Sequence, residues 1–195
     1  MALTPAGRVS FPELYVPKAA AANATPKYSL LLMFKVDELD EDGKAKLQAM
    51  KKAANDACVA EFGVGLGEEY RGEPIASPFK KSEKKPEYMP PGYIYVRLSG
   101  KKKPVVLDQA KNPIPETAPD EQAIYGGCWA HVSYGVYTYD INGNRGVAFG
   151  LNRIQKLRDD EKFGREDEDE FEVVEQAGND EFDTVPANAT DDIPF

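Results

Sequence analysis

The sequence predicts a small antiparallel β-barrel with one clear helix, followed by a disordered acidic tail. Three observations indicate this: several short strand-forming runs, a single amphipathic helical segment, and a final acidic stretch without hydrophobic periodicity. The runs lack the strand–helix–strand rhythm of a parallel sheet, which favours a barrel over an α/β fold. We therefore expect a mainly β domain over residues 1–158 and a disordered tail over residues 159–195.

The first elements are a strand, a helix and a loop. KYSLLLMFKV, residues 27–36, is short and apolar, which is typical of a buried strand. Residues 37–63 begin with acidic side chains, continue with lysines and end at a glycine, as helix signals require. Residues 63–92 are rich in Gly, Pro and Lys, and indicate either a long exposed loop in which a short strand can form or a disordered insertion. The helix is expected to pack through Leu47, Met50, Ala54 and Cys58.

Two strands and a hairpin follow. YIYVRLSG, residues 93–100, alternates between apolar residues and a second set that contains Tyr93, Tyr95 and Arg97. Residues 104–108 predict a short strand, and the proline-rich residues 112–122 a loop. Two further strand-forming runs flank Asn-Gly-Asn at 142–144, a strong hairpin signal because Asn and Gly tolerate positive φ. Their apolar faces are expected to carry Ala130, Val132, Tyr134 and Val136, then Val147, Phe149 and Leu151.

Charge is distributed unevenly along the chain. Residues 159–195 contain 15 Asp and Glu against 2 Lys and Arg, a net charge of −13, whereas residues 1–158 have a net charge of +4. Such asymmetry indicates a nucleic-acid partner or an interaction tail. No apolar run is long enough to cross a bilayer, and the N-terminus lacks a signal-peptide pattern. We expect no membrane association and a cytoplasmic protein.

Little in the sequence points to catalysis, a metal or a cofactor. Two cysteines and one histidine cannot complete a zinc site, and the Gly-rich stretch GVGLGEE lacks the Lys-Ser/Thr of a phosphate-binding loop. Cys128 and His131 lie three apart, so on a strand they point to opposite faces. We therefore expect no enzyme, although a Cys128–His131 pair is kept as a remote alternative.

The non-apolar faces of the strands combine aromatic rings with cations. Unpaired nucleic-acid bases stack on aromatic rings whatever the sequence, and Lys or Arg beside the rings can bind phosphates. The alternative is ordinary packing of strand tyrosines and solvated lysines. The expected stacking residues are Tyr93, Tyr95, Trp129, Tyr137 and Tyr139. The expected phosphate-binding residues are Lys35, Arg97, Lys101, Lys102, Lys103, Arg145, Arg153 and Lys156.

Four stretches of the chain resemble known single-stranded DNA-binding proteins. The last residues, DDIPF, are similar to the C-terminal tip of the bacterial proteins. RVSFPELYVPKA, KYSLLLMF and NGNRGVAFGLNRIQKLRDD resemble the phage family with an oligonucleotide/oligosaccharide-binding (OB) fold. The resemblance implies a non-enzymatic protein that protects unwound DNA in replication, recombination or repair, in the cytoplasm of the host cell if phage-encoded. One departure is that the clear helix follows the first strong strand, not the third.

The resemblance also implies a role for the tail. In the bacterial proteins the terminal Phe and its carboxylate dock on partner proteins, so replication or recombination proteins are expected to bind Asp191, Asp192, Ile193, Pro194 and Phe195. By charge alone, the tail can occupy a basic groove when DNA is absent. The competing interpretation is a protein-interaction module, with the acidic tail as a decoy and no nucleic-acid binding. DNA binding by the body without its tail distinguishes the two hypotheses.

Overall fold

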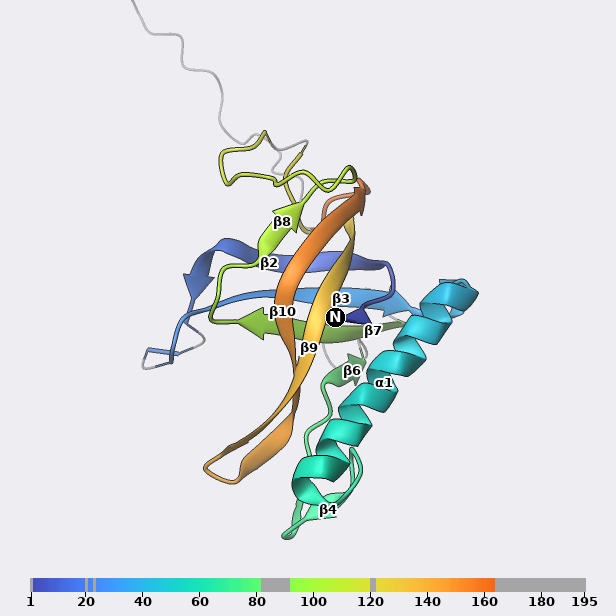
Figure 1. Cartoon of the computed structure of the whole chain (residues 1–195), viewed down its shortest axis with the longest axis vertical. Helices are drawn as coiled ribbons and strands as arrows, with labels where there is room; N and C mark the ends of the chain where they lie inside the picture. Colours follow the sequence, from blue (N-terminus) through green and yellow to red (C-terminus); the bar gives the residue numbers. More distant parts are fainter. Residues whose placement is uncertain (1, 20, 23, 82–91, 120–121, 164–195) are drawn as a thin grey trace, which may run out of the picture. The chain divides into compact units, whose positions relative to one another are not determined.

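The computed structural model describes residues 2–19, 21–22, 24–81, 92–119 and 122–163 (Figure 1). Two compact units divide the chain, Met1–Gly164 and Arg165–Phe195. The second unit, which holds most of the predicted tail and its terminal DDIPF, lies outside the described residues. Every helix and strand of the described residues belongs to the first unit.

Five strands pair into a closed ring, which confirms the predicted barrel. In ring order they are β2 (Gly7–Lys18), β3 (Lys27–Lys35), β7 (Tyr93–Gly100), β10 (Asn144–Arg158) and β9 (Trp129–Ile141), which pairs again with β2. All pairs are antiparallel except β7 with β10. The order first, second, third, fifth, fourth is that of an OB-type barrel. Figure 1 shows the long β9–β10 pair crossing β2, β3 and β7.

Three short strands pair with strands of the ring. β1 (Ala2–Leu3) pairs with β9, β6 (Phe79–Lys81) with β7, and β8 (Val105–Leu107) with β10. A separate two-stranded sheet joins β4 (Glu69–Tyr70) to β5 (Glu73–Pro74). The predicted loop at 63–92 thus contains three short strands, and its residues 82–91 lie outside the described residues.

The helix α1 (Glu41–Phe62) forms within the predicted residues 37–63; it starts four residues later than expected and ends at the predicted glycine. The Asp40 side chain accepts a hydrogen bond from the Gly43 N–H at 2.7 Å, which satisfies a free donor of the first turn. Gly63 ends the helix with φ 75°, a conformation that glycine adopts without a steric penalty. A single-turn 3-10 helix, η1 (Val36–Glu38), connects β3 to α1. The predicted packing face is confirmed, because four residues are buried: Leu47, Met50, Ala54 and Cys58.

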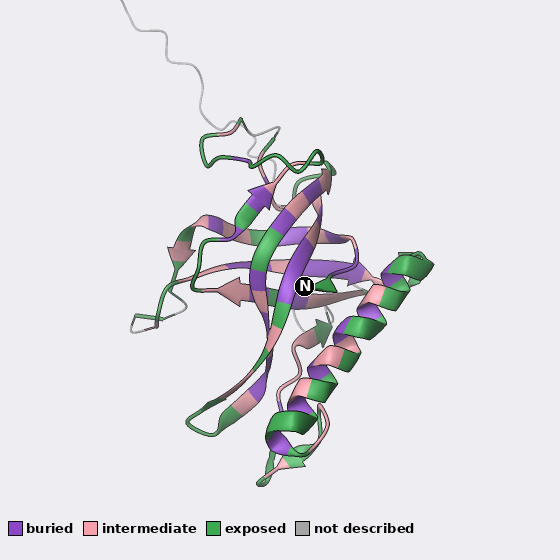
Figure 2. Ribbon diagram, in the orientation of Figure 1, coloured by how far each residue is buried: buried purple, intermediate pink, exposed green. Residues whose placement is uncertain are grey.

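The barrel interior is filled by the apolar residues that the alternation predicts. Figure 2 colours buried residues purple along the ribbon. Val96, Phe149 and Val132 come from three different strands, and each side chain is fully buried. The β9–β10 turn is also confirmed, since Asn142 and Gly143 have φ of 52° and 85°. The core therefore determines which side of each ring strand faces the barrel interior and which side faces outward.

Two features of the fold differ from the sequence-based expectation. The first ring strand, β2, is not predicted because it contains Pro12 and Pro17, which normally mark non-strand or edge segments. With β2 included, α1 follows the second ring strand rather than the first. The other difference is that residues 159–163, which we expected to be disordered, are held against the barrel by side chains of the body.

Candidate nucleic-acid interface

The outer face of the ring consists of the residues that alternate with the core residues. Residues paired directly across neighbouring strands point to the same side of a sheet. One row of pairs runs from β9 through β2, β3 and β7 to β6, and joins Trp129, Arg8, Met33, Tyr95 and Lys80. Trp129 and Tyr95 therefore share the outer face although their strands are not neighbours.

The other predicted stacking residues lie on this face as well. Tyr93 is two residues before Tyr95 in β7, on the same side. Ser99 of β7 pairs with Gly150 of β10, which in turn pairs with Gly135 of β9, so these three residues face the same side. Tyr137 and Tyr139 are two and four residues after Gly135, and therefore face that side too. Tyr137 is the most open of the five aromatic residues, with 39% of its surface exposed.

A groove of about 320 Å³ opens beside Tyr137, and three lysines line it. We call this the lysine groove and define it by Tyr137, Lys27, Lys101 and Lys102. None of the three lysines forms an ion pair with another described residue. An aromatic ring beside several uncompensated cations is the arrangement that single-stranded nucleic acid requires. Lys27 was missed by the sequence reasoning, although it is the first residue of the predicted strand.

Two other predicted cations remain accessible on or beside the outer face. Arg97 is exposed, and its Nη2 donates a hydrogen bond to Ser29 Oγ at 3.1 Å, which orients the guanidinium along β3. Arg153 is exposed and forms no ion pair within the described part of the chain. Both can contribute positive charge to a bound phosphate.

The remaining predicted cations are held by acidic residues of the chain itself. Lys35 pairs with Glu38, Lys103 with Glu116 at 3.7 Å, and Arg145 with Asp140 at 2.7 Å. Lys156 is only 4% exposed and pairs with Asp159 at 2.6 Å. Because its ammonium is buried and compensated, we do not include Lys156 in the proposed interface.

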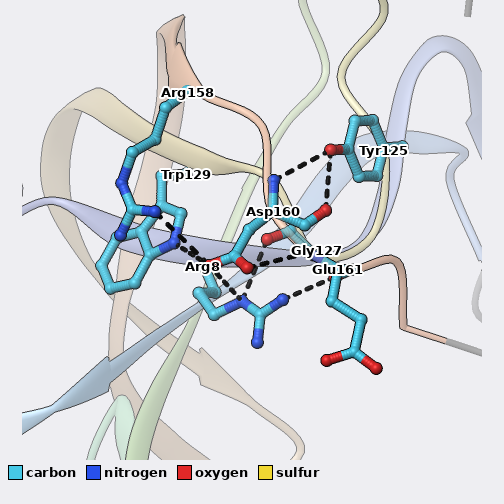
Figure 3. Close-up of polar contacts among 7 residues, drawn as sticks. All are labelled: Arg8, Tyr125, Gly127, Trp129, Arg158, Asp160 and Glu161. Atoms are coloured by element: carbon cyan, nitrogen blue, oxygen red, sulfur yellow. Dashed lines mark hydrogen bonds and ion pairs between the residues drawn. The ribbon is translucent and has the colours of Figure 1, made fainter. Parts of the chain in front are cut away.

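Residues 159–163 contact Trp129 and Arg8 of the outer face, and we call them the clasp segment; Figure 3 shows its Asp160 and Glu161. Trp129 Nε1 donates to Asp160 Oδ2 at 2.6 Å, and the Tyr125 hydroxyl donates to the Asp160 carbonyl oxygen at 2.9 Å. The Arg158 guanidinium stacks on the Trp129 ring, 4.4 Å from its centroid. One ring face and the N–H of Trp129 are thus engaged within the protein, and its stacking on DNA stays a prediction.

Arg8 and Gly127 complete the clasp. Arg8 Nη2 donates to the Glu161 carbonyl oxygen at 2.5 Å, and the same guanidinium lies 4.1 Å from the Phe163 ring centroid. Gly127 has φ 115°, and a Cβ at this position would collide with the Glu161 carbonyl oxygen. The clasp segment therefore depends on a glycine for its path across the body.

The electrostatics of the clasp favour ionised Asp160. The hydrogen bond from Trp129 first, and then the Glu161 N–H and the positive charges of Arg8 and Arg158, lower the pKa of Asp160 below its usual 3.8. A depressed carboxyl pKa in the folded state stabilises the fold at neutral pH, and this stabilisation is lost as the pH falls through that pKa. We therefore expect the clasp to weaken at acidic pH.

Cys128 and His131 do not form a thiol–imidazole pair. The Cys128 side chain is fully buried, and burial raises the pKa of its thiol, which opposes formation of a reactive thiolate. His131 Nδ1 lies 3.0 Å from the Thr4 carbonyl oxygen. Within the described residues, no group of three or more His, Cys, Asp or Glu is arranged to hold a metal ion. No described helix is both long and apolar enough to span a membrane.

Comparisons with known proteins find similar phage proteins. The family model described as "Enterobacter phage Enc34, ssDNA-binding protein" matches residues 2–183. Protein p50 of Acyrthosiphon pisum secondary endosymbiont phage 1 is 34% identical over 93 residues, which cover 46% of this chain and 48% of the relative. The match thus spans about half the length of that curated relative.

Two solved structures share the fold. The single-stranded DNA-binding protein of bacteriophage Enc34, in complex with ssDNA, has a TM-score of 0.67 at 21% identity. That alignment covers 83% of this chain and 88% of the Enc34 chain. The protein gp2.5 of bacteriophage T7, a single-stranded DNA-binding protein, has a TM-score of 0.50 at 16% identity, covering 87% and 96% of the two chains.

Proposed function

This chain belongs to the family of the Enterobacter phage Enc34 ssDNA-binding protein, and from that premise we propose that it binds single-stranded DNA without sequence preference and without catalysis. The observation that carries the proposal is the lysine groove beside exposed Tyr137 on the outer face of the barrel. In OB folds, the face of the second and third strands and the loop between the last two bind oligonucleotides. Here those elements are β3, β7 and the β9–β10 hairpin.

The mechanism combines stacking with charge neutralisation. A base stacks on an aromatic ring for about 1–3 kcal/mol, and every base offers a π-face, so this contact does not select a sequence. Lys27, Lys101 and Lys102 line the same groove as Tyr137 and can neutralise the adjoining phosphates. Each phosphate contact releases counterions, so affinity is expected to fall steeply with salt. Tyr93 and Tyr95 extend the aromatic surface along β7.

The acidic tail serves two further roles in this proposal. Its terminal residues Ile193, Pro194 and Phe195 recruit replication or recombination proteins, with a Phe ring for apolar burial and a proline that lowers the entropy lost on ordering. Residues 165–195 contain 12 acids and one base, and they compete with DNA for the basic groove. These residues lie outside the described part of the chain, and the support for both roles comes from the sequence.

The direct test is a titration of a fluorescently labelled oligo-dT, followed by anisotropy, with the full chain and with residues 1–164. The shorter chain retains the whole described core. We expect both to bind, affinity to fall with salt, and residues 1–164 to bind more tightly at low salt. A labelled oligonucleotide of mixed sequence should bind with similar affinity. Absence of binding by both chains would contradict the proposal and favour a protein-interaction module.

A further inference from the structure

Strand β2 is irregular at Phe11. The register against β3 shifts between Ser10 and Glu13, so β2 carries one extra residue in a bulge at this point. Phe11 itself has φ 46°, a backbone conformation that bulky side chains rarely adopt. Bulges redirect side chains out of the regular alternation, and strained conformations persist where the surrounding structure imposes them. The bulge presents the Phe11 ring to solvent, with 55% of the residue exposed.

A second groove, of about 210 Å³, lies beside this ring. We call it the Phe11 groove and define it by Phe11, Leu31, Ser29 and Arg97. Leu31 and Arg97 are directly paired residues of β3 and β7, so both lie on the outer face. The Arg97 guanidinium, held by Ser29 Oγ, supplies a positive charge next to the exposed ring. This aromatic–cation arrangement resembles that of the lysine groove.

The two grooves are consecutive on the outer face. Ser29 and Ser99 are paired across β3 and β7, and Ser29 lines the Phe11 groove while Ser99 lines the lysine groove. Tyr137 lies on β9, so a path from it across β10, β7 and β3 to Phe11 on β2 covers four strand spacings, about 19 Å. The strand order thus places Arg97, on β7, between Tyr137 on β9 and Phe11 on β2.

We propose that Phe11 is a further base-stacking residue and that the Phe11 groove binds a nucleobase of the same DNA strand that occupies the lysine groove. This inference rests on the proposed function, because its ligand is single-stranded DNA. Arg97 binds the phosphate between the two base positions. The proposal gives a reason for the exposure of a large apolar side chain and for the positive φ at Phe11.

The test compares two substitutions on the same strand in the full chain. Phe11→Ala removes the ring, and Val16→Ala is the matched control, because Val16 is 59% exposed on β2 and does not line the groove. Labelled oligo-dT is the probe, and the melting temperature of each variant reports on folding. We expect Phe11→Ala to weaken binding by about 5- to 150-fold, the effect of losing one stacked base. Val16→Ala should bind as the original chain does.

Three more variants distinguish a loss of binding from a loss of fold. Phe11→Leu keeps an apolar side chain without an aromatic face, and it should lose affinity as Phe11→Ala does, whereas Phe11→Tyr should retain it. Phe11→Trp, made together with Trp129→Phe, places the only indole at the groove, and its fluorescence should be quenched in parallel with the anisotropy change.

The outcomes separate this inference from the function on which it rests. If the original chain binds oligo-dT while Phe11→Ala and Val16→Ala bind equally well, or if the indole at position 11 is not quenched, only the role of Phe11 is overturned. If the original chain does not bind oligo-dT, the proposed function fails and this inference fails with it.

Discussion

The lysine groove and the clasp lie on one face of the same barrel, and both combine an aromatic residue with cations. At the clasp, Asp160 accepts a hydrogen bond from the Trp129 N–H at 2.6 Å and forms ion pairs with Arg8 and Arg158. The indole N–H and both positive charges thus have partners within the chain. At the lysine groove, Tyr137 is exposed, and Lys27, Lys101 and Lys102 form no ion pair with a described residue. Similar residue types therefore stabilise the fold at one site and are available for a ligand at the other.

The largest expected difference between the two regions concerns stacking. Tyr137→Ala should weaken binding to oligo-dT by about 1–3 kcal/mol, because the ring offers an exposed surface to a base. Anisotropy titration at fixed salt measures this change. Trp129→Phe is the matched variant at the clasp. It should lower the melting temperature and leave the affinity for oligo-dT nearly unchanged. A Tyr137→Ala variant with unchanged affinity would remove the lysine groove from the interface.

The charge of the groove should appear in the salt dependence. Lys101→Ala combined with Lys102→Ala should reduce the slope of log affinity against log salt by about 1.4, since each contact with a single strand contributes about 0.7. The matched control is Lys44→Ala combined with Lys52→Ala, two exposed lysines of α1 that pair with Glu41 and Asp56. Equal slopes in the two double variants would show that net charge alone, and not the groove, drives binding.

The clasp should contribute to stability rather than to affinity. Asp160→Asn keeps the shape of the side chain but removes the negative charge of the group that accepts the Trp129 N–H. The free energy of unfolding should therefore fall by about 1 kcal/mol. Urea denaturation measures this value. Asp56→Asn, at the exposed pair with Lys52, is the control and should change stability little. If Asp160→Asn and Asp56→Asn lower the free energy of unfolding equally, the clasp does not contribute more to stability than an exposed ion pair.

The smallest expected effect is a pH dependence of the clasp. The pKa of Asp160 is lower in the folded protein than in the unfolded chain, so its stabilising contribution is present above about pH 4 and disappears as the pH falls further. Unfolding free energies measured between pH 6 and pH 3 should fall less steeply in Asp160→Asn than in the original chain. Parallel pH profiles would show that Asp160 does not hold the clasp.

Sequence patterns predicted most of the barrel because its elements carry local signals. The alternation around Val96, the Asn142–Gly143 turn and the end of α1 at Gly63 each follow from neighbouring residues. β2 was missed because local proline rules oppose a strand there, and pairing with β3 and β9 overrides them. The pairing of distant strands that closes the ring has no such local signal.

The candidate site was only partly predictable. Alternation placed the five aromatic residues on one face, but sequence could not show which cations are compensated, because that depends on partners brought together by the fold. The contact between Trp129 and Asp160 and the burial of Lys156 illustrate this limit. The exposure of Phe11 depends on a backbone bulge, and the run SFPE gives only a weak sign of it.

The most direct test of the account is a lysine footprint of the full chain with and without saturating oligo-dT. Acetylation of each lysine, quantified by mass spectrometry, reports which ammonium groups the DNA covers. The account predicts that Lys27, Lys101 and Lys102 become protected, while Lys44 and Lys52 on α1 react at unchanged rates. Uniform protection of all five, or protection of the helix lysines alone, would contradict binding of single-stranded DNA at the lysine groove.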